Sequence, residues 1–386
     1  MSKSNINDTL PKEDTDDDDD DEKEEKDVVV VGLKKKDDDD DEKANMNDAN
    51  GKKKKKTPVT IITGFLGAGK TTLVNYILKS SQHGLKIAVI ENEFGAVSID
   101  ESLVAENVKE KEDIISMDNG CVCCTVRGDL VRALMQLKDR KDKTFDAVII
   151  ETTGLADPAP VAFTFFLNPE IADYYELDSI LCLVDAKHVH LHLEEEKKEG
   201  AVNEAVSQVA FADRILLNKI DLVSKERLEE TKKVLKAINS SAEVIETQNS
   251  QVDLKKVLGV SSFSVEKTLE HDPSFLDENK SKIHDLTGVG SVGIECEGEL
   301  DFNRVNEFMM NLLQENSANM YRSKGVFCFQ GQGDAKFVFQ GVHEQINFGP
   351  SGNEWRKGEK KLNRMVFIGR DLNREQLESG FRKCLV

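Results

Sequence analysis

The segment GFLGAGKTT, residues 64–72, constrains the fold of this chain more than any other stretch. It matches the phosphate-loop pattern G-x4-G-K-[ST], directly follows the apolar run VTIIT at residues 59–63, and opens a segment with a helical pattern. Backbone N–H groups of such a glycine-rich turn can surround a phosphate, the lysine adds a positive charge, and the helix amino terminus favours an anion. The pattern predicts a strand–loop–helix unit that binds a nucleotide. A glycine-rich turn without a ligand is the alternative.

Five further apolar runs follow the first, with helical stretches between them. They occupy residues 86–92, 146–151, 179–185, 214–219 and 242–247. Continuous apolarity, in contrast to alternation, is typical of parallel strands that helices cover on both faces. The sequence therefore predicts a doubly wound α/β domain with a mostly parallel sheet over residues 58–258.

The carboxyl-terminal part has a different pattern. Alternating apolar segments lie near Ile294, Phe327, Phe339 and Phe367, and helical patterns occupy residues 301–316 and 373–385. Alternation predicts a sheet with one face on a core and the other exposed to solvent. We expect a smaller α+β domain over residues 284–386, joined to the first domain by a polar linker at residues 259–283.

The amino-terminal arm, residues 1–57, consists largely of charge blocks such as DDDDDDE and KKKKK. Its one compact apolar island is Val28–Val31. Blocks of like charge bury too little apolar surface to offset chain entropy, so we expect the arm to be disordered. A nuclear localisation signal is the alternative interpretation of the run Lys52–Lys56.

Charge and cysteine usage exclude several classes of protein. The 386 residues include 72 acidic and 52 basic side chains, a net charge of −20, which argues against nucleic acid as a partner. No apolar run approaches the roughly 20 residues of a membrane span, and the acidic amino terminus does not resemble a secretory signal. Seven cysteines are an odd number, which favours reduced thiols over a disulfide framework. We expect a cytoplasmic protein, with the nucleus as a second location and no membrane partner.

The segment LLNKIDL predicts the base that the nucleotide carries. Asn218, Lys219 and Asp221 follow an apolar run at the edge where open α/β sheets bind ligands. An aspartate there can accept hydrogen bonds from the ring N–H and 2-amino groups of guanine, which adenine does not offer. The sequence therefore predicts GTP.

Three residues are expected to take part in hydrolysis. Lys70 brings its charge to the β and γ oxygens, Thr71 puts its hydroxyl on Mg²⁺, and Glu151 holds a Mg²⁺-bound water. A solvated acid at the end of a strand is the alternative for Glu151. TTGLADP, residues 152–158, is expected to sense the γ-phosphate, but it contains no glutamine to orient an attacking water, so we expect slow intrinsic turnover.

The full set of expected nucleotide contacts falls on three segments. It comprises Gly64, Phe65, Leu66, Gly67, Ala68, Gly69, Lys70, Thr71 and Thr72; Cys124, Thr125, Val126, Arg127 and Gly128 at a helix start; and Asn218, Lys219, Ile220 and Asp221.

The segment NGCVCC predicts a zinc site. Cys121, Cys123 and Cys124 can supply three thiolates to one tetrahedral ion. The fourth ligand is open among Glu91, Glu93, a histidine and water. Buried core cysteines and a purely structural zinc site are the alternatives. Residues 125–128 begin a predicted helix whose amides could also face phosphate, so thiols and nucleotide would share one stretch of backbone.

The histidines give a weaker signal. His188, His190 and His192 would share a face only in an extended chain, so a solvated loop or helix face is favoured over a second metal site. Structural roles are expected for His284 and His343.

Eight motifs in order resemble a known family over residues 58–386. They are TGFLGAGKTTL, ENEFG, NGCVCC, ETTGLADP, FADRILLNKIDL, YRSKG, FQGVHE and MVFIG. The combination resembles the CobW-like GTPases and is most similar to the zinc-regulated GTPase metalloprotein activators. The resemblance implies a P-loop GTPase domain, a CobW-type carboxyl-terminal domain and a zinc site on the C-x-C-C thiols. It also implies a metallochaperone that couples GTP hydrolysis to zinc delivery, with methionine aminopeptidase type 1 as the client of similar eukaryotic proteins.

Two departures from the family pattern concern metal and client. Ala96 stands where many relatives have a second acid, and the Cys-Pro-x-Leu-Val-Pro docking motif of animal relatives is absent from residues 1–57. Three rival functions stay open: a regulatory GTPase with a structural zinc, a non-catalytic scaffold that uses the charged arm, and a cobalt chaperone.

Overall fold

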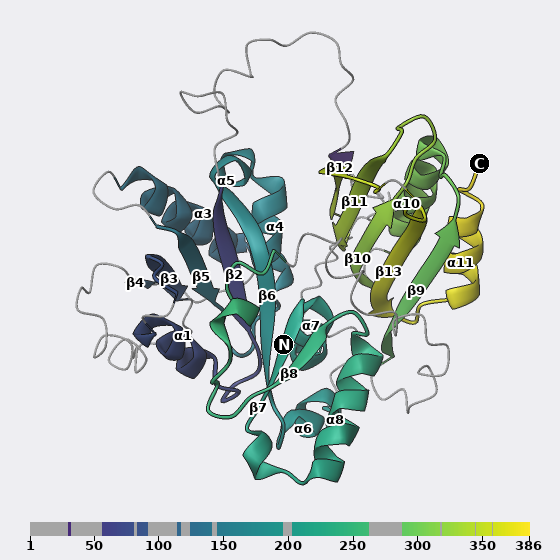
Figure 1. Cartoon of the computed structure of the whole chain (residues 1–386). Helices are drawn as coiled ribbons and strands as arrows, with labels where there is room; N and C mark the ends of the chain where they lie inside the picture. Colours follow the sequence, from purple (N-terminus) through teal and green to yellow (C-terminus); the bar gives the residue numbers. More distant parts are fainter. Residues whose placement is uncertain are drawn as a thin grey trace, which may run out of the picture.

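A computed structural model describes most of the chain (Figure 1). The described residues are 30–31, 56–80, 83–91, 114–116, 124–140, 145–195, 203–261, 288–316, 319–343, 345–356 and 358–386. None of the helices in these ranges is long and apolar enough to cross a membrane.

A seven-stranded parallel sheet forms the first domain, in the order β4-β3-β5-β2-β6-β7-β8. The strands are β2 (Thr57–Thr63), β3 (Ile87–Glu91), β4 (Ile114–Ser116), β5 (Ala147–Glu151), β6 (Tyr175–Asp185), β7 (Arg214–Asn218) and β8 (Glu243–Glu246). All six predicted apolar runs form strands. The seventh, β4, was not predicted.

Helices cover both faces of this sheet (Figure 1). They are α1 (Lys70–Lys79), α3 (Cys124–Asp139), α4 (Ala159–Leu167), α5 (Pro169–Tyr174), α6 (Val189–Leu193), α7 (Glu204–Phe211) and α8 (Lys225–Ile238). Ile61 of β2 packs with α3 and α4, whereas its neighbour Ile62 packs with α1. Successive residues of a strand point to opposite faces, so both faces must be apolar. The predicted doubly wound α/β fold is confirmed.

The second domain is a six-stranded sheet in the order β1-β12-β11-β10-β13-β9. Its strands are β9 (Val289–Glu297), β10 (Met320–Phe327), β11 (Ala335–Val342), β12 (Gln345–Glu354) and β13 (Leu362–Arg370), with helices α10 (Phe302–Asn316) and α11 (Arg374–Arg382). These five strands pair antiparallel, and both helices pack on one face of the sheet. The predicted α+β domain is confirmed, except that β12 was not predicted.

The sixth strand of this sheet comes from the amino-terminal arm. Val30–Val31 form the two-residue strand β1, which pairs parallel with Ile346 and Asn347 of β12. Valine suits strands, and β12 would otherwise be an edge strand with unpaired backbone groups. The prediction of disorder is therefore wrong for Val30–Val31 and for Thr57, which begins β2, and for the part of the arm outside the described residues it stays a prediction.

The other face of the second sheet packs on the first domain, so the predicted exposed face is wrong. Every residue of β10 is buried. Val326 and Val366 of this sheet share one core with Phe211 of α7 and Leu235 of α8. The sequence pattern misled because the polar residues of β10, Arg322, Ser323 and Lys324, are buried although they do not belong to an apolar core.

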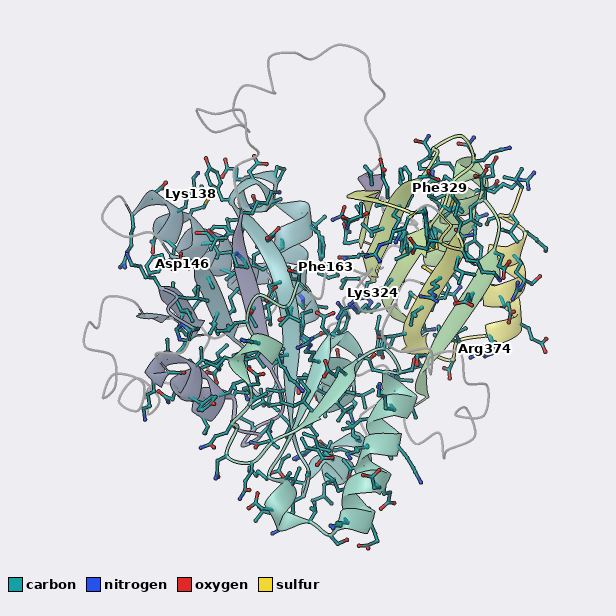
Figure 2. All side chains as sticks on the ribbon, in the orientation of Figure 1. Lys138, Asp146, Phe163, Lys324, Phe329 and Arg374 are labelled. Atoms are coloured by element: carbon teal, nitrogen blue, oxygen red, sulfur yellow. The ribbon has the colours of Figure 1, made fainter. Side chains whose placement is uncertain are left out.

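Those polar residues are interface groups and do not face solvent. Arg322 and Lys324 of β10 both bind the carboxylate of Asp213, which follows α7 in the first domain. Figure 2 shows Lys324 at the boundary between the two domains. Polar residues of a strand can therefore face a partner domain as well as solvent.

Candidate nucleotide-binding site

The loop between β2 and α1 has the backbone that a phosphate cradle requires. Gly64 has a φ of 136°, and a Cβ atom there would lie 2.2 Å from the carbonyl oxygen of Leu183. Gly69, at the start of α1, has a φ of 110°. Only glycine takes such angles without strain. The loop therefore turns its backbone close to β6 and delivers the chain into α1.

Lys70 is the first residue of α1, and its side chain folds back over the loop. Its Nζ donates to the carbonyl oxygens of Gly64, at 2.8 Å, and Phe65, at 3.3 Å. The side chain is buried, so its charge lies inside the cradle. Phosphate oxygens of a nucleotide can accept the same hydrogen bonds, and they carry a full negative charge.

A hydroxyl and a carboxylate meet beside this loop. The Thr71 hydroxyl donates to Oε1 of Glu151 at 2.8 Å. Glu151 ends β5 and lies in register with Glu91, which ends β3, and both side chains are buried. Carboxylate and hydroxyl oxygens are the donors that Mg²⁺ prefers, so this pair fits the ion. Thr71 and Glu151 would hold the Mg²⁺, which would supply charge neutralisation next to the phosphates.

Asn218 connects the end of β7 to the phosphate loop. Its Nδ2 donates to the Ala68 carbonyl at 2.9 Å and to the Ser250 hydroxyl at 3.0 Å. Its Oδ1 accepts from the Ser250 N–H at 2.9 Å and from the Thr247 hydroxyl at 3.2 Å. Asn218 therefore fixes the phosphate loop relative to the segment after β8, and its contact with the nucleotide base stays a prediction.

Ser250 and Thr247 were not among the predicted site residues. The Ser250 hydroxyl also donates to the Gly69 carbonyl at 3.0 Å, across 181 positions of sequence. The only signal in the sequence was a polar run after the last predicted strand, at the edge where the other site residues lie.

The residues after Asn218 turn sharply. Lys219 is left-handed, with a φ of 61°, and its Nζ lies 2.8 Å from Oδ2 of Asp185. Burial would raise the pKa of Asp185, but hydrogen bonds from His188 and Lys219 hold that pKa below its ordinary value. Asp221 follows in a short 3₁₀ helix with an exposed side chain. Its carboxylate is thus available to a guanine base.

The segment 152–158 lies against the phosphate loop. The Thr152 N–H donates to the Ile62 carbonyl at 3.0 Å, and a Cβ atom on Gly154 would lie 2.6 Å from the backbone nitrogen of Leu66. Only a glycine permits this approach. The segment predicted to sense the γ-phosphate therefore touches the loop predicted to cradle it.

Known protein families account for this arrangement. The CobW/HypB/UreG nucleotide-binding domain matches residues 58–246, and the carboxyl-terminal domain of the cobalamin synthesis protein CobW matches residues 289–385. The chain belongs to the CobW family. Together with the geometry above, this makes it a P-loop GTPase by family and fold.

Similar proteins include members from bacteria and fungi. The CobW-family chain is 37% identical over 327 residues to zinc chaperone YjiA of Escherichia coli, with 84% of this chain and 97% of that protein covered. It is 31% identical over 353 residues to zinc-regulated GTPase metalloprotein activator 1 of Schizosaccharomyces pombe, with 82% and 83% covered. The crystal structure of Zn(II)-bound YjiA GTPase from E. coli matches with a TM-score of 0.66 at 32% identity, with 86% and 100% covered.

The predicted zinc ligands of this CobW-family chain lie mostly outside the described residues. Cys121, Cys123 and Glu93 are in that part of the chain, and Cys124 is described only as the first residue of α3. The side chains of Thr125, Val126 and Arg127 are likewise not described, whereas Gly128 is exposed on the helix. Glu91, the other carboxylate considered as the fourth ligand, is buried at the end of β3.

The three clustered histidines do not converge. The helical geometry of α6 separates them, and each contacts a different group: His188 Nδ1 lies 3.0 Å from Asp185 Oδ2, His190 Nε2 lies 3.0 Å from the Thr231 hydroxyl, and the His192 ring stacks on Phe65. Within the described ranges no three His, Cys, Asp or Glu side chains could hold a metal ion together. A second metal site on these histidines is not supported.

His343 has a packing role, as expected. Its ring lies 5.5 Å from that of Phe211 and 5.7 Å from that of Tyr321, at the boundary between the domains. His284 lies outside the described residues.

Proposed function

We propose that this CobW-family GTPase is a zinc chaperone, which couples GTP binding and hydrolysis to the delivery of zinc to a client metalloprotein. One observation carries the proposal: Glu91 and Ser116 end neighbouring strands beside the Thr71–Glu151 pair, and α3 begins at Cys124. The chain segment with Cys121 and Cys123 joins Ser116 to Cys124, so the thiols and the nucleotide contacts proposed at residues 124–128 would share one stretch of backbone. The names of the relatives, as a zinc chaperone and a zinc-regulated GTPase activator, support the choice of metal.

Zinc is the cargo in this proposal. Cys121, Cys123 and Cys124 would supply three thiolates, and an incomplete protein ligand set suits a metal that must leave. A loop that changes with nucleotide state would then change the site's affinity for zinc. Among the described residues, the buried Glu91 carboxylate at the end of β3 is the proposed fourth zinc ligand.

GTP is the proposed nucleotide, and turnover is proposed to be slow. The exposed Asp221 carboxylate can accept two hydrogen bonds from guanine, one from the ring N–H and one from the 2-amino group. Adenine does not offer these two donors. TTGLADP offers no glutamine side chain to orient the attacking water. Hydrolysis of GTP and not ATP, at a low rate that a client or metal changes, is the expected result of a turnover assay.

Zinc affinity in different nucleotide states tests the proposal. Competition with a chromogenic chelator would give the affinity with a non-hydrolysable GTP analogue, with GDP and without nucleotide. We expect the GTP analogue to hold zinc more tightly than GDP does, and equal affinities in all three would rule out the coupling. Native zinc affinity in a Cys123→Ser variant would refute the thiol assignment.

The same samples separate the rival functions. If zinc is only structural, chelation should unfold the protein and not merely empty the site. If the cargo is cobalt, the metal content of the purified protein should show it. The proposed place of action is the cytosol, and methionine aminopeptidase type 1 is the proposed client. A pull-down with protein locked in the GTP form, followed by zinc transfer to the captured protein, would test the client.

A further inference from the structure

Helix α7 lies between the segment 152–158 and the carboxyl-terminal domain. Gln208, in the middle of this helix, is 1% exposed. Its Nε2 donates to the carbonyl oxygens of Gly154, at 3.1 Å, and Ala156, at 3.0 Å. One side chain therefore holds the segment on both sides of the exposed Leu155.

Ser207, the neighbouring residue of α7, holds the next part of the segment. Its hydroxyl donates to Oδ1 of Asp157 at 3.0 Å, and the same oxygen accepts the N–H of Ala159 at 3.0 Å. Ala159 begins α4. The segment is thus attached to α7 from Gly154 to Asp157, and its exit into α4 is fixed as well.

The other end of α7 is held by the carboxyl-terminal domain. Arg322 donates to the Phe211 carbonyl and, through its second guanidinium nitrogen, to Oδ1 of Asp213 at 2.6 Å. Lys324 donates to the same carboxylate oxygen, and the Ile180 N–H donates to Oδ2 at 2.8 Å. These two cationic side chains of β10 therefore bind both the last turn of α7 and the residue that leads into β7.

Opposite charges strengthen this contact between α7 and β10. Burial would raise the pKa of Asp213, but Arg322 and Lys324 hold that pKa below its ordinary value. The carboxylate is therefore ionised at neutral pH, and the side chains of Asp213, Arg322 and Lys324 are all buried. A buried charge that loses a partner is strongly destabilised, so this end of α7 moves only together with β10.

Asn239, the residue that follows α8, prevents α7 from unwinding at this end. Its Nδ2 donates to the carbonyls of Val209 at 2.9 Å, Ala210 at 3.1 Å and Ala212 at 2.9 Å. These bonds satisfy carbonyls that a helix end leaves open. The helix therefore connects its two ends as one rigid element.

We propose that Gln208 is a positioning residue for GTP hydrolysis, which holds the segment 152–158 against the phosphate loop, and that the carboxyl-terminal domain sets the position of Gln208 through α7. The inference rests on the proposed GTPase activity. Its physical basis is that reacting groups must be placed closely, and a misplacement of about 1 Å can lower a rate by about 100-fold. Gly154 meets the phosphate loop at Leu66, so a shift of its carbonyl moves the contact itself.

Replacing Gln208 by leucine tests the first part. Gln208→Leu keeps the size of the side chain and removes both donors to the segment. We expect kcat for GTP to fall by about 10- to 100-fold, with KM and the affinity for GDP changed by less than about threefold, because Lys70, Asn218 and Asp221 are untouched. An unchanged kcat overturns the proposal, as does a parallel loss of kcat and GDP affinity.

Asn203→Ala is the matched control on the same helix. Asn203 caps α7 by accepting the Val206 N–H at 3.1 Å, and its Nδ2 donates to the His192 carbonyl at 2.8 Å; among the described residues, none of its hydrogen bonds reaches the segment 152–158. We expect a lower Tm, as for a lost cap, with kcat within about threefold of the parent. If this variant loses kcat as strongly as Gln208→Leu at equal folded fraction, general destabilisation explains both and the positioning role is wrong.

Lys324→Met tests the link to the second domain. This substitution leaves Asp213 paired with Arg322, so the protein should stay folded. We expect Lys324→Met to change kcat several-fold in the parent protein. In the Gln208→Leu background, the change in log kcat should be less than half as large. Equal effects in both backgrounds, or none in either, overturn the link. A parent protein that does not hydrolyse GTP would instead refute the proposed function.

Discussion

The nucleotide edge and the domain interface both contain charged side chains, but they differ in what those side chains bind. At the nucleotide edge Lys70 binds the carbonyls of Gly64 and Phe65, which it can exchange for phosphate oxygens. At the interface Asp213 binds Arg322 and Lys324, and all three are buried. The first cluster is suited to a change of partner, whereas the second loses much of its stability if the Asp213 carboxylate is removed. In the proposal above, the interface transmits movement and the nucleotide edge starts it.

The largest expected effect follows from breaking the interface cluster. Asp213→Asn leaves two buried cations without a countercharge, so we expect the free energy of unfolding to fall by about 3–5 kcal/mol in urea unfolding monitored by circular dichroism. Asp139→Asn at the exposed end of α3 is the control and should change stability by less than about 0.5 kcal/mol. A loss below about 1 kcal/mol for Asp213→Asn would mean that the cluster is not essential to the interface.

The corresponding change at the nucleotide edge should affect activity and spare the fold. Lys70→Met removes the charge but keeps the side chain's length. We expect kcat/KM for GTP to fall by about 10²- to 10³-fold, while Tm changes little, because the lost partners are two loop carbonyls. Lys79→Met, at the exposed end of the same helix, should keep full activity. A Tm loss as large as that of Asp213→Asn would remove the distinction between the two clusters.

A pH series sharpens the contrast at moderate size. Burial, with Arg322 as the second cause, lowers the pKa of Lys324 from 10.5 to about 8. The folded protein thus releases this proton before the unfolded chain does, and between these pH values the unfolded state holds more protons. The free energy of unfolding should therefore rise with pH across this window, and Lys324→Met should remove that rise. Equal slopes for the two proteins in urea unfolding would assign the rise to other groups.

The smallest expected effect is at Ser250. Ser250→Ala removes the hydroxyl that bonds Gly69 and Asn218 but keeps the N–H that binds the Asn218 side chain. We expect a loss of about 0.5–1.5 kcal/mol in unfolding free energy and a rise of severalfold in KM for GTP. Thermal unfolding and initial-rate kinetics would measure both. The control is Ser261→Ala, far along the chain from the phosphate loop, which should leave KM unchanged. If Ser250→Ala has the same KM as the parent, the hydrogen bond from Ser250 to Gly69 is not needed for GTP binding.

The fold could be predicted where local pattern and tertiary environment agree. The runs at β2, β5 and β6 are largely apolar and do not alternate, because helices cover both faces of the sheet. β4 is only Ile114–Ser116 within a charged stretch, too short for a periodic signal. β12 contains glycine and proline, which weaken a strand signal, and its pairing with β11 overrides that local preference.

The candidate site could be predicted where its residues lie within motifs. Lys70, Thr71 and Asn218 have local signatures, and their positions at one sheet edge follow from the parallel order of strands. Gln208 has no signature, because its partner Gly154 lies 54 positions away and only the packing of α7 brings them together. The contact of Lys324 with Asp213 could not be predicted for the same reason, because 111 positions of sequence separate the two residues.

Hydrogen exchange measured by mass spectrometry tests the central claim, that the segment 152–158 and the carboxyl-terminal domain move as one through α7. The full chain would be compared with bound GDP and with a non-hydrolysable GTP analogue. The account predicts that amide exchange changes together in the segment 152–158 and in β10, and that Gln208→Leu confines the change to the segment. A change confined to the segment in the parent protein would contradict the account.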